Sequence, residues 1–156
     1  MMKLANYLKK ENIYICDSSK DTSHFYGDFS QFLKEKGIIN DAKKVKRLFV
    51  KRENLHSTGI GKGVATPHIF SDEFADFFLA MAVIRNGMDF KAPDSLNVHV
   101  IFLIMSDDRD IGLHLKTLAH IARLTNSGDI VSSLKNTANA AEVYGLILEN
   151  EKAILN

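Results

Sequence analysis

Residues 52–68, RENLHSTGIGKGVATPH, constrain the fold more than any other stretch of this chain. Three glycines stand here at alternate positions: Gly59, Gly61 and Gly63. Glycine weakens helices and strands, so this density indicates a tightly turning backbone that can approach a ligand or a neighbouring strand closely. Pro67 fixes its own φ and disfavours helix at Thr66. His68 is therefore predicted to project from a stiff, extended stem.

The spacing of these glycines excludes two nucleotide-binding motifs. A dinucleotide-binding loop has the pattern G-x-G-x-x-G and opens a helix, whereas residues 59–63 read GIGKG and lead into the strand-like pair Val64 and Ala65. A Walker loop places its lysine after the last glycine, whereas Lys62 precedes Gly63. The segment is predicted to supply backbone shape rather than a nucleotide site.

The rest of the chain alternates between helical and strand patterns. Helices are predicted over residues 3–10, from the turn at 17–21 to Gly37, from Asp41 to Arg52, and over 108–126, 129–134 and 140–148. Strands are predicted over residues 13–16, 77–84 and 98–105. The last run is apolar on both faces apart from His99, which indicates a central strand and a structural histidine. Asn86 and Gly87 are predicted to form a tight turn, and the tail after Glu149 is expected to fray.

The predicted helix of residues 108–126 carries two histidines. Its apolar spacing predicts one shared buried face: Ile111, Leu115, Leu118, Ala122 and Thr125. His114 borders that face near the helix start, whereas His120, six residues later, points elsewhere. This spacing argues against a metal site formed by the two histidines on one helix.

Composition narrows the class of protein. The 156 residues fit one domain, residues 1–156, with a core of ordinary size. The formal charge of +1 indicates neither a nucleic-acid partner nor an anionic membrane. The single cysteine, Cys16, excludes a disulfide framework, and no apolar run has the length of a membrane span or a signal peptide. We therefore expect a cytoplasmic protein.

Two blocks of the sequence resemble one known family. The first block contains Arg52-Glu53, residues 57–61 (STGIG), Val64-Ala65 and Pro67-His68. It resembles the phosphohistidine motif of the fructose/mannitol-type EIIA domains of the bacterial sugar phosphotransferase system. That family includes a nitrogen-regulatory branch. The second contains residues 114–118 (HLKTL) and 122–124 (ARL), and it is similar to a later helix of that family that carries a second active-site histidine. The resemblance spans nearly the whole chain and implies an α/β fold, with a mixed sheet of four or five strands flanked by helices on both faces.

The resemblance also implies roles for particular residues. His68 would be the phosphorylated residue, and Arg52 and His114 fall on active-site positions of the family. A planar guanidinium suits a phosphoryl group, and His114 near a helix N-terminus is expected to be a neutral hydrogen-bond donor. Ser57, Thr58 and Gly59 are candidates for contacts to the phosphoryl oxygens. No metal, nucleotide or other cofactor is expected.

Three functions follow as hypotheses. The first is a phosphocarrier that accepts a phosphoryl group from HPr and passes it to a cysteine of an EIIB domain. The second is a regulator of the nitrogen-type group, whose phosphorylation state controls binding to other proteins, with a homodimer as one option for assembly. The third, a metal hydrolase, lacks the H-E-x-x-H or H-x-x-E-H cluster. Ile69 and Thr66 depart from the family pattern beside His68, and we expect Ile69 to affect access to the histidine or the choice of partner.

Overall fold

The computed structural model describes residues 2–126 and 129–155; residues 1 and 156, the predicted domain bounds, lie outside it. Within this part the chain forms one mixed sheet with the strand order β1-β5-β6-β3-β2, and β4 also pairs with β6. The strands are β1 (Ile13–Cys16), β2 (Gly59–Gly61), β3 (Val64–Ala65), β4 (His68–Phe70), β5 (Phe78–Met88) and β6 (Val98–Ser106). The antiparallel pair β5 and β6 forms the centre, and β1, β3 and β4 add to it in parallel. The glycine-rich segment thus becomes three short strands.

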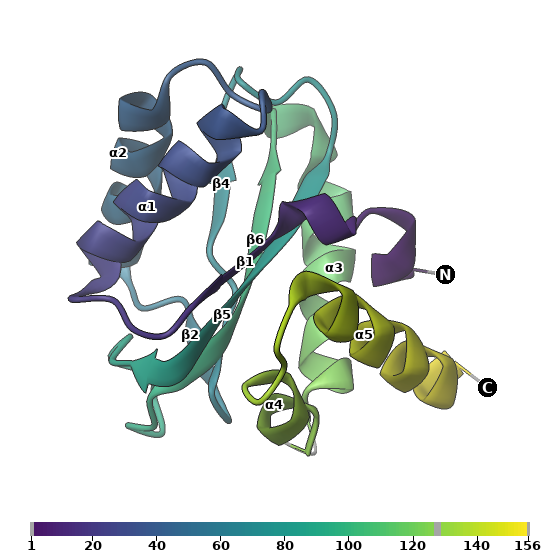
Figure 1. Ribbon diagram of the computed structural model, residues 1–156. Helices are drawn as coiled ribbons and strands as arrows, with labels where there is room; N and C mark the ends of the chain where they lie inside the picture. Colours follow the sequence, from purple (N-terminus) through teal and green to yellow (C-terminus); the bar gives the residue numbers. More distant parts are fainter. Residues whose placement is uncertain (1, 127–128, 156) are drawn as a thin grey trace.

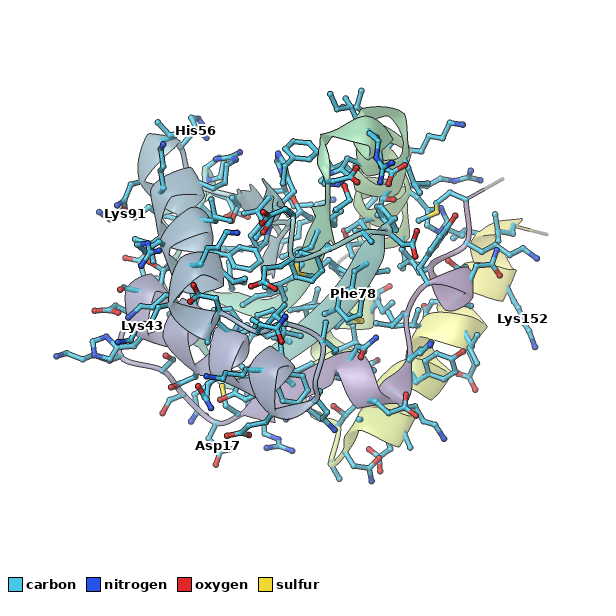
Figure 2. The ribbon with its side chains drawn as sticks, turned by 90° about the horizontal axis from the view of Figure 1, so that it is seen from above. Asp17, Lys43, His56, Phe78, Lys91 and Lys152 are labelled. Carbon is cyan, nitrogen blue, oxygen red and sulfur yellow. The ribbon has the colours of Figure 1, made fainter. Side chains whose placement is uncertain are left out.

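Helices cover both faces of the sheet, which confirms the predicted fold class (Figure 1). One layer contains α1 (Thr22–Glu35) and α2 (Ala42–Leu55). The other contains α3 (Ile111–Leu124), α4 (Asp129–Leu134) and α5 (Ala140–Leu155), with the short 3₁₀ helices η1 (Leu4–Asn6), η2 (Lys10–Asn12) and η3 (Asp108–Asp110). Figure 2 shows Lys43 and Lys152 pointing outward from the two layers on opposite sides of the molecule.

Local sequence signals explain where the first two long helices begin. The side chain of Asp21 accepts a hydrogen bond from the backbone N–H of His24, at 2.8 Å, and so caps α1. Asp41 caps α2 in the same way through the N–H of Lys44, at 3.0 Å. Each cap satisfies a backbone donor that the first helical turn leaves unpaired.

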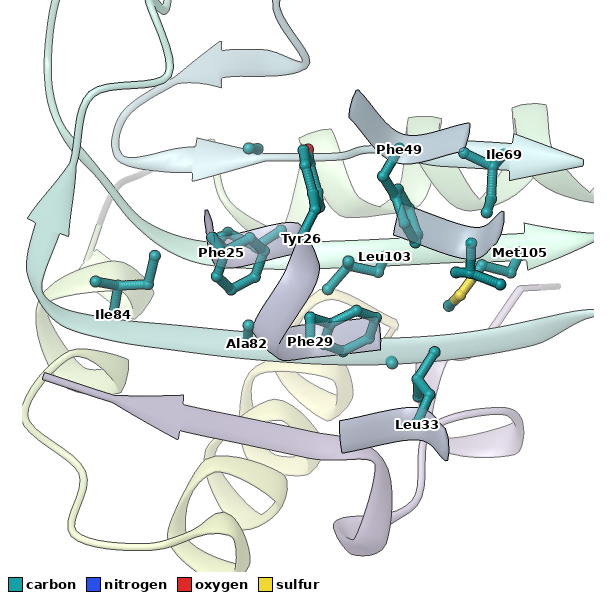
Figure 3. Close-up of a cluster of buried hydrophobic side chains, with 14 of the residues drawn as sticks. Phe25, Tyr26, Phe29, Leu33, Phe49, Ile69, Ala82, Ile84, Leu103 and Met105 are labelled. Atoms are coloured by element: carbon teal, nitrogen blue, oxygen red, sulfur yellow. The ribbon is translucent and has the colours of Figure 1, made fainter. Parts of the chain in front are cut away.

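The central strand β6 divides the core into two clusters because its side chains alternate between the faces of the sheet. Ile101, Leu103 and Met105 pack into the cluster under α1 and α2. Figure 3 shows this cluster, in which aromatic rings from the two helices, Phe25, Tyr26, Phe29 and Phe49, lie over the sheet. Val100, Phe102 and Ile104 pack into the opposite cluster, under α3, α4 and α5. Each such side chain, once buried, contributes about 1.5–3 kcal/mol.

The predicted turn at Asn86 and Gly87 is wrong. Both residues lie within β5, where the pairing with β6 shifts register between Val83 and Met88. Gly87 has a φ of +76°, and a Cβ at this position would lie 2.8 Å from the ring of His99. The glycine with positive φ is therefore part of a β-bulge here and not of a hairpin turn.

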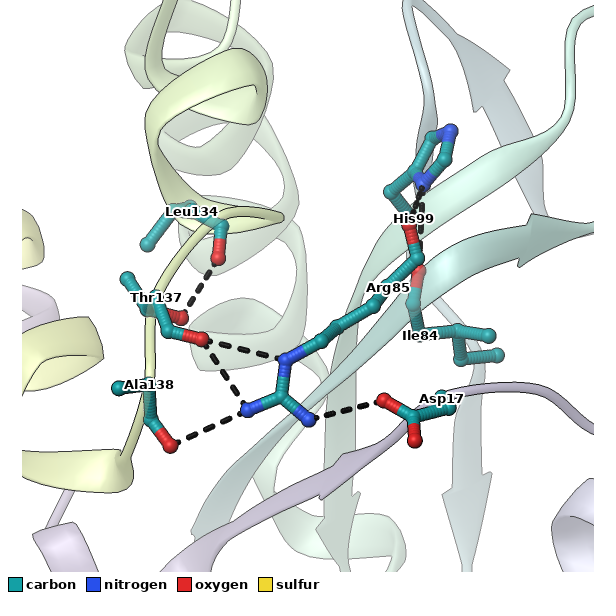
Figure 4. A network of polar contacts seen from close by, with 7 residues as sticks. All are labelled: Asp17, Ile84, Arg85, His99, Leu134, Thr137 and Ala138. Atoms are coloured by element: carbon teal, nitrogen blue, oxygen red, sulfur yellow. Dashed lines mark hydrogen bonds and ion pairs between the residues drawn. The ribbon is translucent and has the colours of Figure 1, made fainter.

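Arg85, beside this bulge, connects three parts of the chain (Figure 4). Its guanidinium donates hydrogen bonds to the carbonyl oxygens of Thr137 and Ala138, and it pairs with the carboxylate of Asp17 at 3.1 Å. The ring Nδ1 of His99 lies 3.1 Å from the carbonyl oxygens of Ile84 and Arg85. These contacts agree with the structural role predicted for His99.

Two predicted helix ends are also wrong. Helix α2 continues past Arg52 to Leu55, because the Arg52 guanidinium donates to the carbonyl of His56 at 2.8 Å and so holds the last turn. Helix α5 continues past Glu149 to Leu155, because Glu151 is buried and its carboxylate binds the N-terminal segment. In both cases a contact outside the local pattern extends the helix.

Candidate functional site

The stem of His68 is held on both sides by backbone hydrogen bonds. Thr66 donates its N–H to the carbonyl of Thr58 at 2.9 Å, and the carbonyl of Pro67 accepts from the N–H of Ile104 at 3.0 Å. Strand β4, which begins at His68, pairs in parallel with β6. The histidine is therefore attached to the central strand of the sheet, as a rigid stem requires.

Side chains alternate along β4, and this decides what His68 faces. Ile69 is buried in the hydrophobic cluster on the α2 side, whereas Phe70 is partly exposed. The Phe70 ring stacks on the His114 ring with a centroid distance of 4.6 Å. The His68 ring lies 6.2 Å from the same His114 ring, at an angle of 82°. The two histidines that the sequence separates by 46 positions are therefore neighbours.

The ring of His68 is half-buried and has one backbone partner. Its Nδ1 lies 3.3 Å from the carbonyl oxygen of Thr66. A carbonyl can only accept, so Nδ1 carries the proton and Nε2 carries the lone pair in the neutral ring. Burial lowers the pKa of His68, the hydrogen bond to Thr66 opposes this shift, and the charge of Arg52 adds to it. The lowered pKa favours the neutral ring, whose lone pair is on Nε2.

A pocket of about 360 Å³ opens beside His68. Its walls contain four of the six predicted site residues: Arg52, Ser57, Thr58 and His68. His114 is the fifth, and it adjoins the pocket through its ring contact with His68. Gly59 does not line the pocket, and its N–H donates to the Ser57 hydroxyl oxygen at 3.1 Å. A Cβ there would lie 2.8 Å from that of Ala92, so this glycine permits close packing.

The hydroxyl groups of the motif already have partners. Ser57 donates to the carbonyl of Phe90 at 2.5 Å, and Thr58 donates to a carboxylate oxygen of Glu53 at 2.6 Å. The backbone N–H of Thr58 donates to the other carboxylate oxygen of Glu53 at 2.7 Å. Ser57 and Thr58 therefore help to fix the shape of the loop, and the phosphoryl contact predicted for them stays a prediction.

Sequence reasoning missed Glu53 as a residue of the site. Its carboxylate accepts from Tyr26 at 2.5 Å in addition to the two bonds from Thr58, and so it joins α1, α2 and the loop. Burial and the adjoining carboxylate raise the pKa of the Tyr26 hydroxyl well above its usual value. The sequence does contain a signal for Glu53: an acidic residue in the last turn of a helix interacts unfavourably with the helix dipole, which indicates that it has a specific partner.

Lys62 was also missed, and it brings a second cation to the pocket. The turn between β2 and β3 has positive φ at three successive residues: Gly61 at 94°, Lys62 at 57° and Gly63 at 82°. The N–H of Lys62 donates to Asp94 at 2.7 Å, which helps to hold this conformation. Its ammonium group contacts the backbone carbonyl of Asn126 and the side-chain oxygen at 3.1 Å. The hairpin is thereby fastened to the end of α3.

The predicted buried face of α3 is wrong. Ile111 and Leu115 are 53% and 62% exposed, and the buried positions are His114, Thr117, His120, Ile121 and Leu124. Of the predicted face only Thr125 is buried, and Leu118, Ala122 and Thr125 form part of the pocket wall. An apolar stripe can thus border a binding surface as well as a core.

The two histidines of α3 meet different surroundings. The His114 ring is stacked on Phe70 and lies edge-on to Phe77 at 5.7 Å, and its Nε2 is 2.7 Å from the hydroxyl of Ser106. Burial lowers the pKa of His114, the nearby His68 lowers it further, and Asp110 opposes the shift. His120 instead lies 2.7 Å from Glu151 of α5. The part of the chain that the structure describes holds no group of three or more His, Cys, Asp or Glu placed to bind a metal.

No helix within residues 2–126 or 129–155 has the length and apolarity needed to cross a membrane.

The chain is similar to known proteins both in sequence family and in fold. Residues 6–150 match the family described as phosphoenolpyruvate-dependent sugar phosphotransferase system, EIIA 2. The chain is 25% identical over 151 residues to the PTS system fructose-specific EIIABC component of Bacillus subtilis (strain 168). That alignment covers 97% of this chain but only 24% of the relative, so the chain spans about a quarter of that relative's length.

Solved structures share the fold. The crystal structure of the nitrogen regulatory protein IIA-Ntr from Neisseria meningitidis matches with a TM-score of 0.81 and 26% identity, over 92% of this chain and 98% of that one. The complex of enzyme IIAMTL and phosphorylated enzyme IIBMTL from Escherichia coli matches with a TM-score of 0.74 and 16% identity, over 91% and 99% of the two chains. The second similarity concerns the fold alone.

Proposed function

The chain belongs to the EIIA 2 family of the phosphoenolpyruvate-dependent sugar phosphotransferase system, and from this we propose that it is a phosphocarrier that receives a phosphoryl group on His68. The observation that carries the proposal is the His68 ring itself: a backbone carbonyl lies next to Nδ1, which leaves the lone pair on Nε2, and His68 lines a pocket together with Arg52. A neutral, oriented imidazole is what nucleophilic transfer needs.

The reaction is an in-line displacement at phosphorus. The lone pair on Nε2 of His68 attacks the phosphorus, a P–N bond forms, and the bond to the donor breaks with its electron pair leaving on the donor. The proton on Nδ1 stays on the hydrogen bond to Thr66, which stabilises the positive charge that develops on the ring. Transfer onward reverses the process, with an acceptor thiolate as the new nucleophile and Nε2 as the leaving group.

Cations beside the ring stabilise the transferred group, whose negative charge spreads over three oxygens. Arg52 and Lys62 line the same pocket as His68. Arg52 binds the carbonyl of His56 through Nη1, which positions the guanidinium at the pocket wall. His114 adds a second imidazole at 6.2 Å between ring centroids. Ser57, Thr58 and Gly59 support the segment that leads to Lys62 and His68.

We propose HPr as the donor and an EIIB cysteine as the acceptor. The Bacillus subtilis relative is named as a fructose-specific EIIABC component, and the Escherichia coli fold neighbour was solved as a complex with phosphorylated enzyme IIBMTL. A regulatory role is the second candidate, favoured by the IIA-Ntr structure, which is 26% identical over nearly the whole chain. Homodimer formation, a cytoplasmic location and a single domain over residues 1–156 stay predictions.

The test is phosphorylation with phosphoenolpyruvate, enzyme I and HPr, followed by intact-mass and peptide analysis. We expect one phosphate on His68, labile in acid and stable in base, and none on His68→Ala. His56→Ala is the matched control, because His56 is an exposed histidine of the same loop. A full adduct on the His68→Ala protein would contradict the assignment.

The choice between transport and regulation needs the acceptor. Phosphorylated protein is presented to EIIB domains from the same organism, and loss of the histidine phosphate is followed over time. Rapid transfer to one EIIB domain supports the transport role. Absence of transfer to any EIIB, together with phosphate-dependent binding to a defined regulated protein, supports the regulatory role.

A further inference from the structure

His114 contains a buried nitrogen without a partner. The residue is 2% exposed, and its Nδ1 has no hydrogen-bond partner among the described residues. Leaving a buried polar group unpaired costs about 1–3 kcal/mol, so its presence beside a functional site requires an explanation. The other ring nitrogen, Nε2, lies 2.7 Å from the hydroxyl oxygen of Ser106, which is fully buried.

The single proton of the Ser106 hydroxyl decides the tautomer of His114. The hydroxyl oxygen lies 2.7 Å from the backbone carbonyl oxygen of Asp107, which can only accept a hydrogen bond. When Ser106 donates to that carbonyl, its oxygen accepts from His114, so the proton of the neutral ring is on Nε2. The unpartnered Nδ1 then carries a lone pair. This arrangement differs from the neutral donor that the sequence predicted.

Two aromatic rings pack against the His114 ring and limit its rotation. Phe70 stacks on one face with an interplanar angle of 24°, and Phe77 stands edge-on at 84°. The His68 ring is the functional neighbour, 6.2 Å away between centroids. A bare lone pair repels a phosphoryl group, whereas a protonated Nδ1 would attract it. The unpartnered Nδ1 is therefore suited to take up a proton when His68 carries a phosphoryl group.

We propose that Ser106 is a positioning residue that holds His114 in the Nε2–H tautomer, so that His114 takes up a proton on Nδ1 when His68 becomes phosphorylated. This inference rests on the proposed function of His68. The proton comes from solvent and the P–N bond is untouched, so charge balances as one imidazolium forms beside one phosphoryl group. Ser106 keeps its bond to His114 in both states, because Nε2 remains a donor.

The surrounding charges set the direction of the change. Before phosphorylation, burial and the neighbouring His68 lower the pKa of His114, while Asp110 at the start of α3 opposes this shift. Asp107 is paired with Arg109, which limits its influence on the ring. The N-terminal end of α3 disfavours a positive charge. A phosphoryl group on His68 introduces negative charge within reach of the ring, which raises the pKa of His114.

The first test measures the tautomer in unphosphorylated protein. Nitrogen-15 chemical shifts of His114 at high pH report which ring nitrogen carries the proton. We expect the Nε2–H form in the wild type and in Ser106→Thr, which keeps a hydroxyl, and a mixture of tautomers in Ser106→Ala. The Nδ1–H form in the wild type would overturn the proposal. This measurement is independent of whether His68 accepts phosphate.

The second test follows the pKa of His114 by NMR titration before and after phosphorylation. We expect an increase of at least about one pH unit in the wild type. Ser106→Ala is expected to transfer phosphoryl groups about tenfold more slowly, with a changed pH profile, and Ser106→Thr to recover the rate. An unchanged His114 pKa on a fully phosphorylated protein overturns proton uptake while leaving the role of His68 intact. Failure of the wild type to phosphorylate overturns both.

Discussion

Two glutamates, one on each face of the sheet, accept similar sets of hydrogen bonds but hold different parts of the chain. Glu53 of α2 accepts from the N–H and hydroxyl of Thr58 and from the hydroxyl of Tyr26, at 2.5–2.7 Å. Glu151 of α5 accepts from the N–H groups of Leu4 and Ala5 at 2.5 and 3.2 Å, and lies 2.7 Å from His120. Each carboxylate thus fastens a backbone segment that has no regular sheet partner.

The difference lies in what each carboxylate fastens. The Glu53 contacts fix the loop that forms the pocket wall beside His68, only five residues along the chain. The Glu151 contacts to Leu4 and Ala5 join residues 147 and 146 positions apart, and none of these three residues lines that pocket. Loss of Glu53 should therefore affect function first, and loss of Glu151 should affect stability first. Four substitutions test this difference between Glu53 and Glu151.

The largest effect is expected from Glu151→Ala, which removes the partner of the buried His120 ring, of the buried N–H of Leu4 and of the part-buried N–H of Ala5. The free energy of unfolding, measured by urea denaturation, is expected to fall by about 4 kcal/mol. The molecules that stay folded are expected to transfer phosphoryl groups at about the wild-type rate. Glu149→Ala, at an exposed position of the same helix, is the control. A variant as stable as the wild type would show that the N-terminal contact contributes little.

Arg52→Lys is expected to slow phosphoryl transfer by about a hundredfold with little loss of stability. Lysine keeps the charge but replaces the planar fork, and it cannot hold the carbonyl of His56 with the same geometry. Rapid-quench kinetics with phosphorylated donor measure the rate, and Arg47→Lys, on the exposed side of α2, is the control. Equal rates for both variants would remove Arg52 from the site.

Glu53→Gln is expected to slow transfer about tenfold, because an amide cannot accept all three hydrogen bonds and the loop around Thr58 loosens. Thermal unfolding should show a smaller loss of stability than Glu151→Ala produces. Glu35→Gln, exposed at the end of α1, serves as the control. If Glu53→Gln lost stability but kept the full rate, the two glutamates would have the same role.

The smallest effect is expected from Tyr26→Phe, which removes one bond to Glu53 and costs about 1.5 kcal/mol. The raised pKa of Tyr26 stabilises the folded protein below the ordinary tyrosine pKa of about 10, and this contribution is lost as pH rises above that value because the unfolded state ionises first. The variant should therefore lose less stability than the wild type between about pH 10 and 11. An unchanged alkaline slope would contradict this role.

The sequence by itself determined the features that depend on near neighbours. Asp21 and Asp41 cap helices because capping needs only a side chain within three residues of the N–H group. The apolar run of β6 predicted a central strand because burial on both faces leaves no polar alternation. Pro67 and the glycines predicted the stem of His68 for the same local reason.

Only the tertiary structure decided the features that depend on distant partners. The ends of α2 and α5, the bulge at Gly87 and the buried face of α3 each follow from contacts that periodicity does not encode. Apolar spacing on α3 selected a stripe that is exposed at Ile111 and Leu115 and borders the pocket at Leu118 and Ala122, because such a stripe has the same period as one that meets the core. Glu53, Lys62 and Ser106 are ordinary polar residues in the sequence, and they gain a role only because folding places distant hydrogen-bond partners around them.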